Sequence, residues 1–525
     1  MDKYSVKNTH DALKNKLIDY INTEYLGKND ALRKACRGEL QKSGMLYQEP
    51  FIEANPAYVT VTDGIKNADL PDTVKDTLSA MAEMDLGVFK NPYQHQIESL
   101  EAFYRGEDLF VATGTGSGKT ECFMWPMVTK LVNEQIQSLD TWATRGIRAI
   151  MLYPMNALVS DQLGRLRRMI GNGENGFHAL LEKIAPNCRV PQFGMYTGRT
   201  PYAGAPNEAK NKDLAATLEK DILNQDSDVK DKLKEIGKYP SKQDLASFIN
   251  RLKTNETILT DELDAELITR HEMQQFCPDI LITNYSMLEY LLMRPIEKSI
   301  WENTKNWLNK NPENKLLFII DEAHMYRGSS GGEVALLVRR VLNKLDIKRD
   351  RVQFILTSAS IPSGEKKERQ VIQFACNLSA QRTENHCFRL IKGKQEHISF
   401  NGTEFDPSVF DDYDIDALQQ DWEIKKNAVK DFGMRAGFSL NCDFENETSV
   451  ERWLYTQLIN CNPMLRIMHQ TRGHATSFTD LSAVAFPDAD QAVSEKATSA
   501  LLAIAPSAKN ENGNVLYPAR LHFVN

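Results

Sequence analysis

Short runs of consecutive apolar residues alternate through the middle of the chain with longer segments whose apolar residues recur every three or four positions. The runs fall at 108–113, 147–153, 190–196, 279–283, 315–320 and 352–357. Strands buried on both faces read as continuous apolar runs, whereas the longer period is typical of amphipathic helices. The pattern therefore predicts an α/β fold, with a parallel sheet covered by helices on both faces.

The regions around this sheet are predicted to be mainly helical. Residues 1–88 repeat apolar positions at helical spacing, and residues 380–525 contain short helical and loop segments. Residues 203–272 are rich in Lys, Asp, Glu and Asn, and mixed charges at helical spacing are typical of a solvated helical insertion. We expect a helical N-terminal region (1–88), a sheet domain (89–379) interrupted by this insertion, and an accessory helical region (380–525).

The composition narrows the class of protein. The 525-residue chain is 42% apolar and 26% charged, which leaves room for about two to four globular domains. No apolar stretch approaches membrane-spanning length and the charged start MDKYSVKNTH is unlike a secretory signal, so we expect a cytoplasmic protein with no membrane partner. Eight scattered cysteines without a C-x-x-C pair argue against a zinc ribbon or an iron–sulfur cluster, unless distant residues build one. A net charge of −8 excludes indiscriminate coating of nucleic acid, so any such binding needs a local basic groove.

The first apolar run leads into a glycine-rich segment, and residues 108–120 read DLFVATGTGSGKT. The glycines allow backbone N–H groups to close around an anionic oxygen, and the following helix points its positive end at the same place. Lys119 would reach the β- and γ-phosphates of a nucleotide, and the Thr120 hydroxyl would take one Mg²⁺ position. The predicted phosphate-binding loop comprises Thr113, Gly114, Thr115, Gly116, Ser117, Gly118, Lys119 and Thr120. A flexible turn is the plain alternative, and Thr113 departs from the usual Gly or Ala.

A later apolar run ends in two carboxylates, in the segment KLLFIIDEAH at residues 315–324. Ligands in open α/β sheets lie at the carboxyl ends of the strands, so this pair is expected beside the phosphate-binding loop. Asp321 would hold Mg²⁺, and Glu322 would orient and deprotonate an attacking water. A solvated acidic turn after a strand is the alternative interpretation.

Residues 113–120 and 321–324 resemble motifs I and II of superfamily 2 helicases of the DEAH type, whose lobes have a RecA-like fold. The resemblance implies ATP and Mg²⁺ as ligands. It implies that Lys119, Asp321 and Glu322 are catalytic, and that His324 belongs to the nucleotide site.

Two flanking segments resemble further motifs of that family. Gln96, in NPYQHQIESL, resembles the Q motif, which reads the adenine base. TSAS at 357–360 resembles motif III, usually Ser-Ala-Thr, and this implies that Ser358 and Ser360 lie beside the nucleotide. Ser360 replaces the usual threonine, but a hydroxyl is retained.

Three other strand ends resemble the nucleic-acid contacts of the same family, namely YPMNALVSDQ at 153–162, MYTGRTP at 195–201 and ITNYSMLEYLL at 282–292. The resemblance implies that backbone phosphates are held by Pro154, Asn156, Ala157, Thr197, Gly198, Arg199, Thr283 and Asn284. Only the family likeness favours DNA over RNA, with a single strand or a duplex end as the partner. Arg165, Arg167 and Arg168 either add charge to this edge or form a solvated basic face. The insertion at 203–272 lies between the second and the third of these segments. A second interpretation is therefore that it forms a clamp over the bound strand.

A narrower resemblance rests on DEAHMYRGSSGGEVALLVRRVL and PDILITNYSMLEYLLMRP. Both segments are similar to the large bacterial helicases of mitomycin repair and of the Druantia and DISARM phage-defence systems. The likeness covers about residues 92–361 and does not separate those systems from one another.

One expected part of such a motor is not recognisable. No Gln-Arg-rich motif of the form Q-x-x-G-R-x-x-R follows Ser360, and in related enzymes arginines of a second RecA-like lobe contribute roughly a thousandfold or more to phosphoryl transfer. We therefore expect weak ATP hydrolysis by this chain alone. The second lobe would come from a protein partner, if the chain is one part of a split helicase, or from a longer chain, if it is a truncated product.

Two functions from different classes remain open at this point. The first is the ATP-binding, nucleic-acid-engaging part of a helicase or translocase in bacterial DNA repair or phage defence. The second is an ATP-gated DNA-binding scaffold that never hydrolyses ATP. Intact Lys119, Asp321 and Glu322 favour the enzyme, because a scaffold has no chemical need for Glu322.

Overall fold

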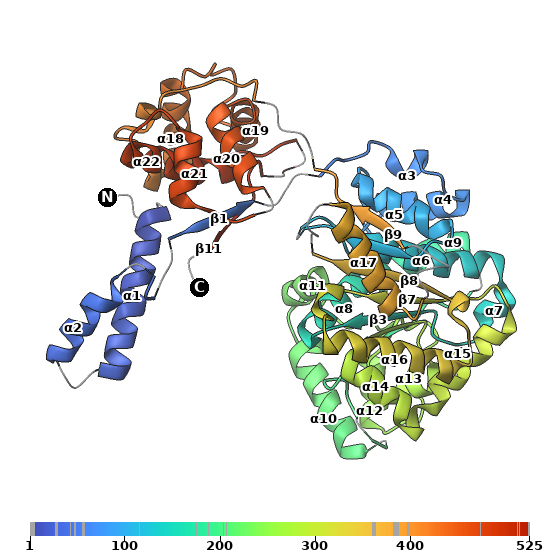
Figure 1. Ribbon diagram of the computed structural model, residues 1–525. Coiled ribbons are helices and arrows are strands. Elements are labelled where there is room, and N and C mark those ends of the chain that lie inside the picture. The colour runs from blue at the N-terminus through green and yellow to red at the C-terminus, as the bar shows by residue number, and fades with distance from the viewer. Residues whose placement is uncertain are drawn as a thin grey trace. The chain divides into compact units, whose positions relative to one another are not determined.

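The computed structural model describes the chain except for residues 1–5, 27–29, 43, 47–48, 55–57, 115, 174–175, 187, 203, 206, 360–363, 382–387, 396–399, 473, 512, 514 and 523–525. It divides into two compact units. Tyr58–Lys394 forms the sheet unit, and Met1–Ala57 together with Gln395–Asn525 forms the helical unit. Each unit is described by itself (Figure 1).

The sheet unit is built around eight parallel strands in the order β5-β4-β6-β3-β7-β8-β2-β9. The strands are β2 (Leu109–Ala112), β3 (Ala149–Tyr153), β4 (Phe193–Tyr196), β5 (Glu266–Leu267), β6 (Ile280–Asn284), β7 (Leu316–Ile320), β8 (Val352–Ser358) and β9 (Arg389–Lys392). All six predicted strands are present, as β2, β3, β4, β6, β7 and β8. The predicted α/β class and the parallel sheet are therefore confirmed, while β5 and β9 were not foreseen.

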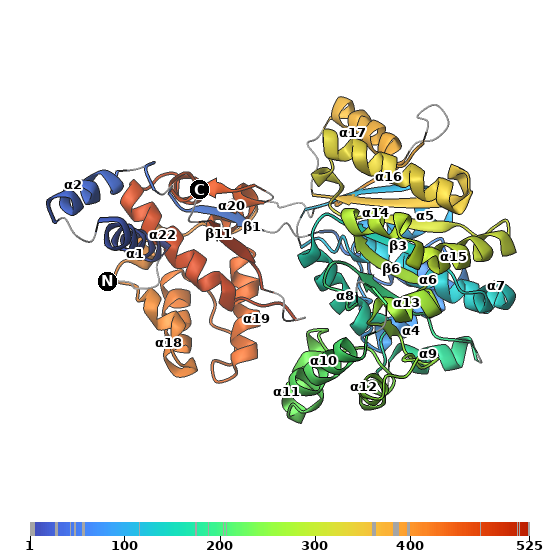
Figure 2. The same cartoon turned by 90° about the horizontal axis from the view of Figure 1, so that it is seen from below.

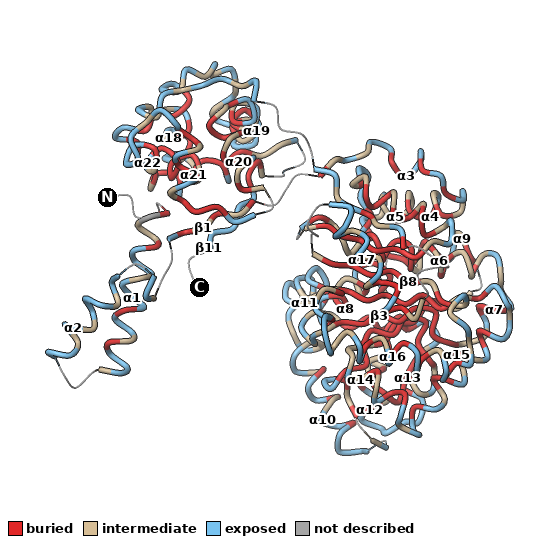
Figure 3. The backbone as a smooth tube through the Cα atoms, viewed as in Figure 1, coloured by how far each residue is buried: buried red, intermediate tan, exposed pale blue. Residues whose placement is uncertain are grey.

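Helices cover both faces of this sheet, as Figure 2 shows. Alternate residues of each strand face opposite layers, so Val111 of β2 packs in one core cluster and Phe110 in the other. One layer contains α3 (Gly64–Asn67), α4 (Asp72–Glu83), α5 (Gln94–Tyr104), α6 (Glu121–Gln137), α7 (Leu139–Ala143), α8 (Asn156–Ile170) and α9 (Phe177–Ile184). The other contains α13 (Arg270–Phe276), α14 (Tyr285–Met293), α15 (Lys298–Lys310), α16 (Ser329–Leu345) and α17 (Glu365–Leu378). The central strands are buried on both sides (Figure 3), which explains their unbroken apolar runs.

The predicted insertion at 203–272 is mainly helical in its described residues. It contains α10 (Glu208–Leu218), a π-helical turn (Glu219–Leu223), α11 (Ser227–Glu235) and α12 (Leu245–Lys253). Leu218, Phe248 and Leu252 belong to a small core of its own. Its end returns to the sheet as β5, which pairs in parallel with β4. The insertion is therefore a satellite of the sheet edge with its own packing.

The helical unit joins the start of the chain to its later part. It contains α1 (Val6–Leu26), α2 (Asp30–Leu40), α18 (Trp422–Arg435), α19 (Glu447–Leu458), α20 (Asn462–Thr471), α21 (Phe478–Ala485) and α22 (Gln491–Ile504). A three-stranded antiparallel sheet, in the order β10-β1-β11, links β1 (Phe51–Ala54), β10 (Thr476–Ser477) and β11 (Ala519–His522). The described residues of this unit contain no second parallel sheet.

The division of the chain differs from the predicted boundaries at residues 88 and 379. Residues 58–88 belong to the sheet unit, because Val74, Leu78 and Met81 of α4 pack in the core beneath the parallel sheet. The sheet unit also extends to Lys394, because β9 adds a strand beside β2. Among the described residues, no helix is both long and apolar enough to cross a membrane.

Candidate functional site

The predicted phosphate-binding loop connects β2 to α6 and has the backbone shape that its glycines suggest. Gly116 and Gly118 have positive φ angles of 75° and 69°, a conformation that strains other residues. A β-carbon at position 118 would also lie 2.3 Å from Nε2 of Gln96. The loop therefore forms a cradle whose tightest point, at Gly118, favours glycine. Thr115 lies outside the described residues.

Thr113, the departure from the usual motif, bridges the base of the loop. Ser117 Oγ donates a hydrogen bond of 2.6 Å to Thr113 Oγ1, and both residues are buried. The backbone N–H of Thr113 lies 3.4 Å from the carbonyl oxygen of Ser358 at the end of β8. Thr113 thus ties the two ends of the loop to each other and to the neighbouring strand.

Two aromatic residues that were not predicted from the sequence, Tyr58 and His95, contact the backbone of the phosphate-binding loop. The Tyr58 hydroxyl accepts a hydrogen bond of 3.1 Å from the backbone N–H of Gly114. The His95 ring lies 2.7 Å from the carbonyl oxygen of Ser117 through Nε2, and the rings of Tyr58 and His95 pack edge to face. Burial lowers the pKa of His95, so its neutral form is favoured here.

Gln96 lies beneath the same loop and is 1% exposed. Its Nε2 donates to the carbonyl oxygen of Gly118 at 3.1 Å, and its Oε1 accepts from the backbone N–H of Tyr93 at 2.9 Å. The Nε2 end of the amide therefore attaches α5 to the phosphate-binding loop, and the Oε1 end caps the start of α5 itself. Its predicted contact with an adenine base stays a prediction.

The two predicted carboxylates follow β7 in different environments. Asp321 is 7% exposed, and its Oδ1 accepts hydrogen bonds from the Thr357 hydroxyl and from the backbone N–H of Glu322. Burial raises the pKa of Asp321. Glu322 has a φ of 50°, in the left-handed region, where backbone strain is typical of functional sites. Thr357, which the sequence placed in motif III without a role, thus orients Asp321.

The phosphate-binding loop and the carboxylates meet at the carboxyl ends of the strands. Lys119 Nζ lies 3.3 Å from Glu322 Oε1, and the two side chains are 12% and 24% exposed. His324 Nδ1 lies 3.2 Å from Glu322 Oε2, without the geometry of a hydrogen bond. Thr120 is half-buried where α6 begins. The predicted nucleotide residues are therefore brought together, while Ser360 lies outside the described residues.

The predicted nucleic-acid contacts follow β3, β4 and β6, three neighbouring strands of the sheet. Ala157, Gly198 and Arg199 are exposed, and Pro154, Asn156 and Asn284 are half-buried. Asn284 Nδ2 donates to Asn156 Oδ1 at 2.6 Å, and Asn284 also caps α14 by accepting from the backbone N–H of Met287. Six of the eight predicted residues therefore have atoms accessible to solvent where β3, β4 and β6 end.

Two of the predicted contacts, Thr283 and Thr197, have buried side chains, and their contact with nucleic acid stays a prediction. Thr283 is fully buried, and its hydroxyl donates to the carbonyl oxygen of Tyr196 at 2.7 Å. Thr197 is 1% exposed, and its hydroxyl accepts from the backbone N–H of Arg199 at 3.2 Å. A hydroxyl at a strand end does not reveal in sequence which way it points. Both side chains therefore order the strand ends.

The three arginines of α8 do not form a free basic face. Arg167 binds both carboxylate oxygens of Glu266, at 2.8 and 2.6 Å. Arg165 pairs with Glu121 at 3.2 Å, and Arg168 donates to the carbonyl oxygen of Glu235 at 3.4 Å. Arg167 therefore neither adds charge to the nucleic-acid edge nor belongs to a solvated basic face, because Glu266 neutralises its charge inside the sheet unit.

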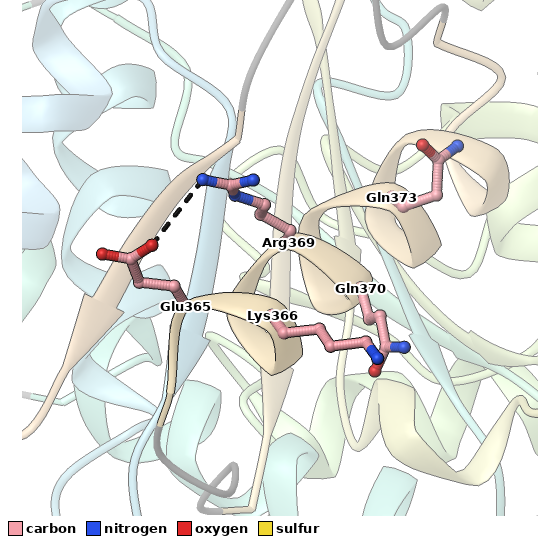
Figure 4. Close-up of a pocket in the computed structure, with 5 residues that line it drawn as sticks. All are labelled: Glu365, Lys366, Arg369, Gln370 and Gln373. Carbon is pink, nitrogen blue, oxygen red and sulfur yellow. Dashed lines mark ion pairs between the residues drawn. The ribbon is translucent and has the colours of Figure 1, made fainter.

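Two hollows flank this region. One of about 420 Å³ lies where the ends of β3 and β6 face α16, and its walls include Asn156, Asn284, Tyr326 and Glu333. The other runs along α17 and is lined, among the described residues, by five side chains of that single helix (Figure 4). Only the first joins side chains from several elements beside the predicted site.

A family model described as "DEAD/DEAH box helicase" matches residues 93–187 and 227–368. The matched residues include the phosphate-binding loop, the Asp321-Glu322 pair and Thr357. Residues 93–368 of the chain therefore resemble a DEAD/DEAH box helicase domain. The unmatched residues 188–226 include β4, its turn and the first helix of the insertion.

Comparison with known proteins gives relatives of this chain among longer proteins. The chain is 37% identical to the Druantia protein DruE of Escherichia coli over 559 residues, covering 99% of this chain and 30% of that protein. It is 20% identical to the uncharacterised ATP-dependent helicase MJ1574 of Methanocaldococcus jannaschii over 269 residues, or 51% of this chain and 26% of that one. The chain thus spans less than a third of the length of either relative.

Among solved structures, the chain is similar to the crystal structure of the DUF1998 helicase MrfA bound to DNA and AMPPNP. The TM-score is 0.36 at 15% identity, covering 82% of this chain and 47% of that chain. Mss116p bound to ssRNA and AMP-PNP gives a TM-score of 0.34 at 14% identity, covering 68% of this chain and 52% of that chain.

Proposed function

We propose that the chain binds ATP with Mg²⁺ and hydrolyses it to drive movement along a nucleic acid, with DNA as the favoured substrate. The process served is phage defence or DNA repair in bacteria. The observation that supports this most is the distance of 3.3 Å between Lys119 Nζ and Glu322 Oε1. At this distance the Lys119 ammonium group, which can bind phosphate, lies beside the Glu322 carboxylate, which can act on water.

The residues at the strand ends fit a magnesium-bound triphosphate. Magnesium prefers oxygen ligands and is usually bound by one or two carboxylates together with substrate phosphates and water. Thr120 and Asp321 would supply such oxygens. When bound, Mg²⁺ neutralises charge on the phosphates during transfer. The positive-φ cradle at Gly116 and Gly118 is shaped for the phosphates themselves.

The chain's own groups have separable tasks in hydrolysis. Lys119 leaves Glu322 and binds the phosphates, which frees the Glu322 carboxylate. Glu322 then accepts a proton from the water that attacks the γ-phosphorus, while the bond from the γ-phosphorus to the bridging oxygen breaks and ADP leaves. Asp321 is oriented by Thr357, which connects the expected metal position to the end of β8.

Movement on nucleic acid requires an edge that holds a strand without reading its sequence. Asn156, Gly198, Arg199 and Asn284 lie at the ends of three neighbouring strands, and backbone phosphates are held by such small polar groups and N–H groups. Full hydrolysis needs arginines of a second RecA-like lobe, from a partner or a longer chain.

The test is hydrolysis of ATP with and without single-stranded DNA, for the wild-type chain and for Glu322→Gln. Removing a general base costs roughly 10²–10⁴-fold in rate, so Glu322→Gln should lose hydrolysis while it retains ATP and DNA binding. Addition of the polypeptide that supplies the second lobe should raise wild-type hydrolysis roughly a thousandfold. If wild type with that polypeptide stays at background while ATP still changes DNA affinity, the chain is the non-hydrolysing scaffold instead.

A further inference from the structure

The hollow of about 420 Å³ beside α16 has walls from three segments of the chain. Residues 154–156 follow β3, residues 284–286 follow β6, and Tyr326 lies between β7 and α16. Asn156 and Asn284 are predicted nucleic-acid contacts, whereas Tyr326 belongs to the segment that begins with the two carboxylates. A strand held by Asn156 and Asn284 would therefore lie beside Tyr326.

One short turn joins Tyr326 to the carboxylates. The backbone N–H of Met325 donates to the carbonyl oxygen of Glu322 at 2.9 Å, and that of Tyr326 donates to the carbonyl oxygen of Ala323 at 3.0 Å. On the other side, α16 packs so closely that a β-carbon at Gly331 would lie 2.4 Å from the Tyr326 carbonyl oxygen. The backbone of Tyr326 is therefore fixed on both sides, and its side chain is the part that can respond to a ligand in the hollow.

The Tyr326 hydroxyl is a buried donor without an acceptor. The residue is 5% exposed, and its hydroxyl has no hydrogen-bond partner among the described residues. Buried polar groups normally have a partner, because leaving one unpaired costs free energy. Burial raises the pKa of Tyr326, and the negative charge of Asp321 raises it further. The hydroxyl therefore keeps its proton and lies within electrostatic reach of that carboxylate.

The Asp321 carboxylate can accept a further hydrogen bond. Among the described residues, both hydrogen bonds to its side chain end on Oδ1, from the Thr357 hydroxyl and from the backbone N–H of Glu322. The other oxygen remains for a metal ion or a further donor. Outer hydrogen bonds that orient a metal-binding carboxylate typically change metal affinity about 10- to 100-fold.

We propose that Tyr326 is a positioning residue that couples the nucleic-acid edge to the metal position. A strand that occupies the hollow fixes the Tyr326 side chain so that its hydroxyl donates to the Asp321 carboxylate. The oriented carboxylate then binds ATP with Mg²⁺ more tightly. The inference rests on the proposed function and deepens it, because it names the side chain through which bound nucleic acid acts on the nucleotide. By thermodynamic linkage, ATP with Mg²⁺ raises the affinity for DNA by the same factor.

The experiment measures the affinity of the whole chain for single-stranded DNA with and without ATP and Mg²⁺. The ratio of the two affinities is the coupling factor, and it is compared between variants. We expect a coupling factor of about fivefold or more for wild type. Tyr326→Phe removes only the hydroxyl, so its DNA affinity should no longer depend on ATP.

Tyr153→Phe is the matched control. The Tyr153 hydroxyl is also buried without a partner among the described residues, and the charge of Asp321 raises the pKa of Tyr153 too. However, Tyr153 packs on the opposite face of the sheet from Tyr326 and does not line the hollow. Its coupling factor should equal that of wild type.

The melting temperature of the unliganded protein separates this role from a structural one. Removal of a buried hydroxyl that has no partner should leave the melting temperature unchanged or raise it, in both variants. A lower melting temperature for Tyr326→Phe would show that the hydroxyl already has a partner in the free protein, and would overturn the inference.

Two further results would overturn the inference while the proposed ATP and nucleic-acid sites stand. One is an equal coupling factor for Tyr326→Phe and Tyr153→Phe. The other is a wild-type chain that binds ATP and DNA independently of each other. If wild type binds no ATP or no DNA, the proposed function itself fails, and this inference fails with it.

Discussion

Lys119 Nζ lies 3.3 Å from Glu322 Oε1, although the two residues are 203 positions apart in the sequence. They follow β2 and β7, which are separated in the sheet by β8. Their ion pair is partly buried. While they are paired, Lys119 is not free to bind phosphates and Glu322 is not free to act on water. A triphosphate that binds the loop must replace Glu322 as the partner of Lys119.

Glu322→Gln should therefore bind ATP more tightly than wild type. The substitution removes the competing carboxylate and its repulsion of the γ-phosphate, and we expect a gain of about tenfold or more from one charged contact. Titration with ATP and Mg²⁺ measures this directly. Glu302→Gln, on the exposed face of α15, is the control. Weaker binding by Glu322→Gln would show that the carboxylate is part of the binding surface.

Gly118→Ala should damage the loop more than Gly106→Ala. Both glycines have positive φ angles, 69° and 81°, so both substitutions cost on the order of 1 kcal/mol from backbone strain. Only at Gly118 would the new methyl group collide with Gln96, whereas nothing lies within 4 Å at Gly106. We expect a larger loss of thermal stability for Gly118→Ala than for Gly106→Ala, with loss of ATP binding confined to Gly118→Ala. Equal ATP affinity in the two variants would contradict the described cradle.

Acidification should weaken the support beneath the loop through His95. Burial lowers its pKa from 6.5, so the folded protein binds a proton at His95 less readily than the unfolded chain does. The stability that neutral His95 contributes is full above pH 6.5 and falls as the pH drops below that value. His95→Gln should show a smaller loss of melting temperature over the same pH interval. His178→Gln should reduce the loss of melting temperature in the same direction, because burial lowers the pKa of His178 too. Only His95→Gln should also make ATP binding less dependent on pH, because His95 contacts the loop whereas His178 lies in α9. An equal effect of the two variants on the pH dependence of ATP binding would remove any special role for His95.

Asp279 anchors the strands that present the nucleic-acid edge. It is fully buried, and its carboxylate binds Arg189 at 2.6 and 2.7 Å and Arg148 at 3.2 Å. Burial alone would raise the pKa of Asp279, but the two arginines hold it below its ordinary value. Asp279→Ala leaves two guanidinium groups without this partner, and we expect a loss of about 3–5 kcal/mol in the free energy of unfolding.

Urea unfolding measures that loss, with Glu208→Ala as the control. Glu208 forms an exposed ion pair with Lys212 on α10, so its removal should leave the unfolding curve unchanged. If Asp279→Ala unfolds like wild type, the buried cluster does not hold β3, β4 and β6 in register.

The sequence predicts the parallel sheet well, because its central strands are buried on both faces and read as uninterrupted apolar runs. β5 is only two residues long and lies inside a segment dominated by charge. Two of the four positions of β9, Arg389 and Lys392, are charged and exposed. Neither strand has the continuous apolar run by which the other six strands were predicted. The boundaries of the sheet unit therefore differ from the predicted ones.

The candidate site was predictable where backbone shape depends on residue type, as at Gly116 and Gly118. It was less predictable where the direction of a side chain decides the function. Thr283 is fully buried while neighbouring Asn284 is partly exposed, and no local pattern separates them. Tyr58 reaches the loop from 56 positions upstream, a contact that exists only after folding.

The central claim is that one triphosphate with its metal binds between Lys119 and the carboxylates Asp321 and Glu322. Equilibrium titration of wild type and Lys119→Ala with ATP and Mg²⁺ tests it most directly. A lost hydrogen bond to a charged group costs about 1.5–3 kcal/mol, so Lys119→Ala should bind at least about tenfold more weakly. Equal affinity of the two proteins for ATP would contradict the account.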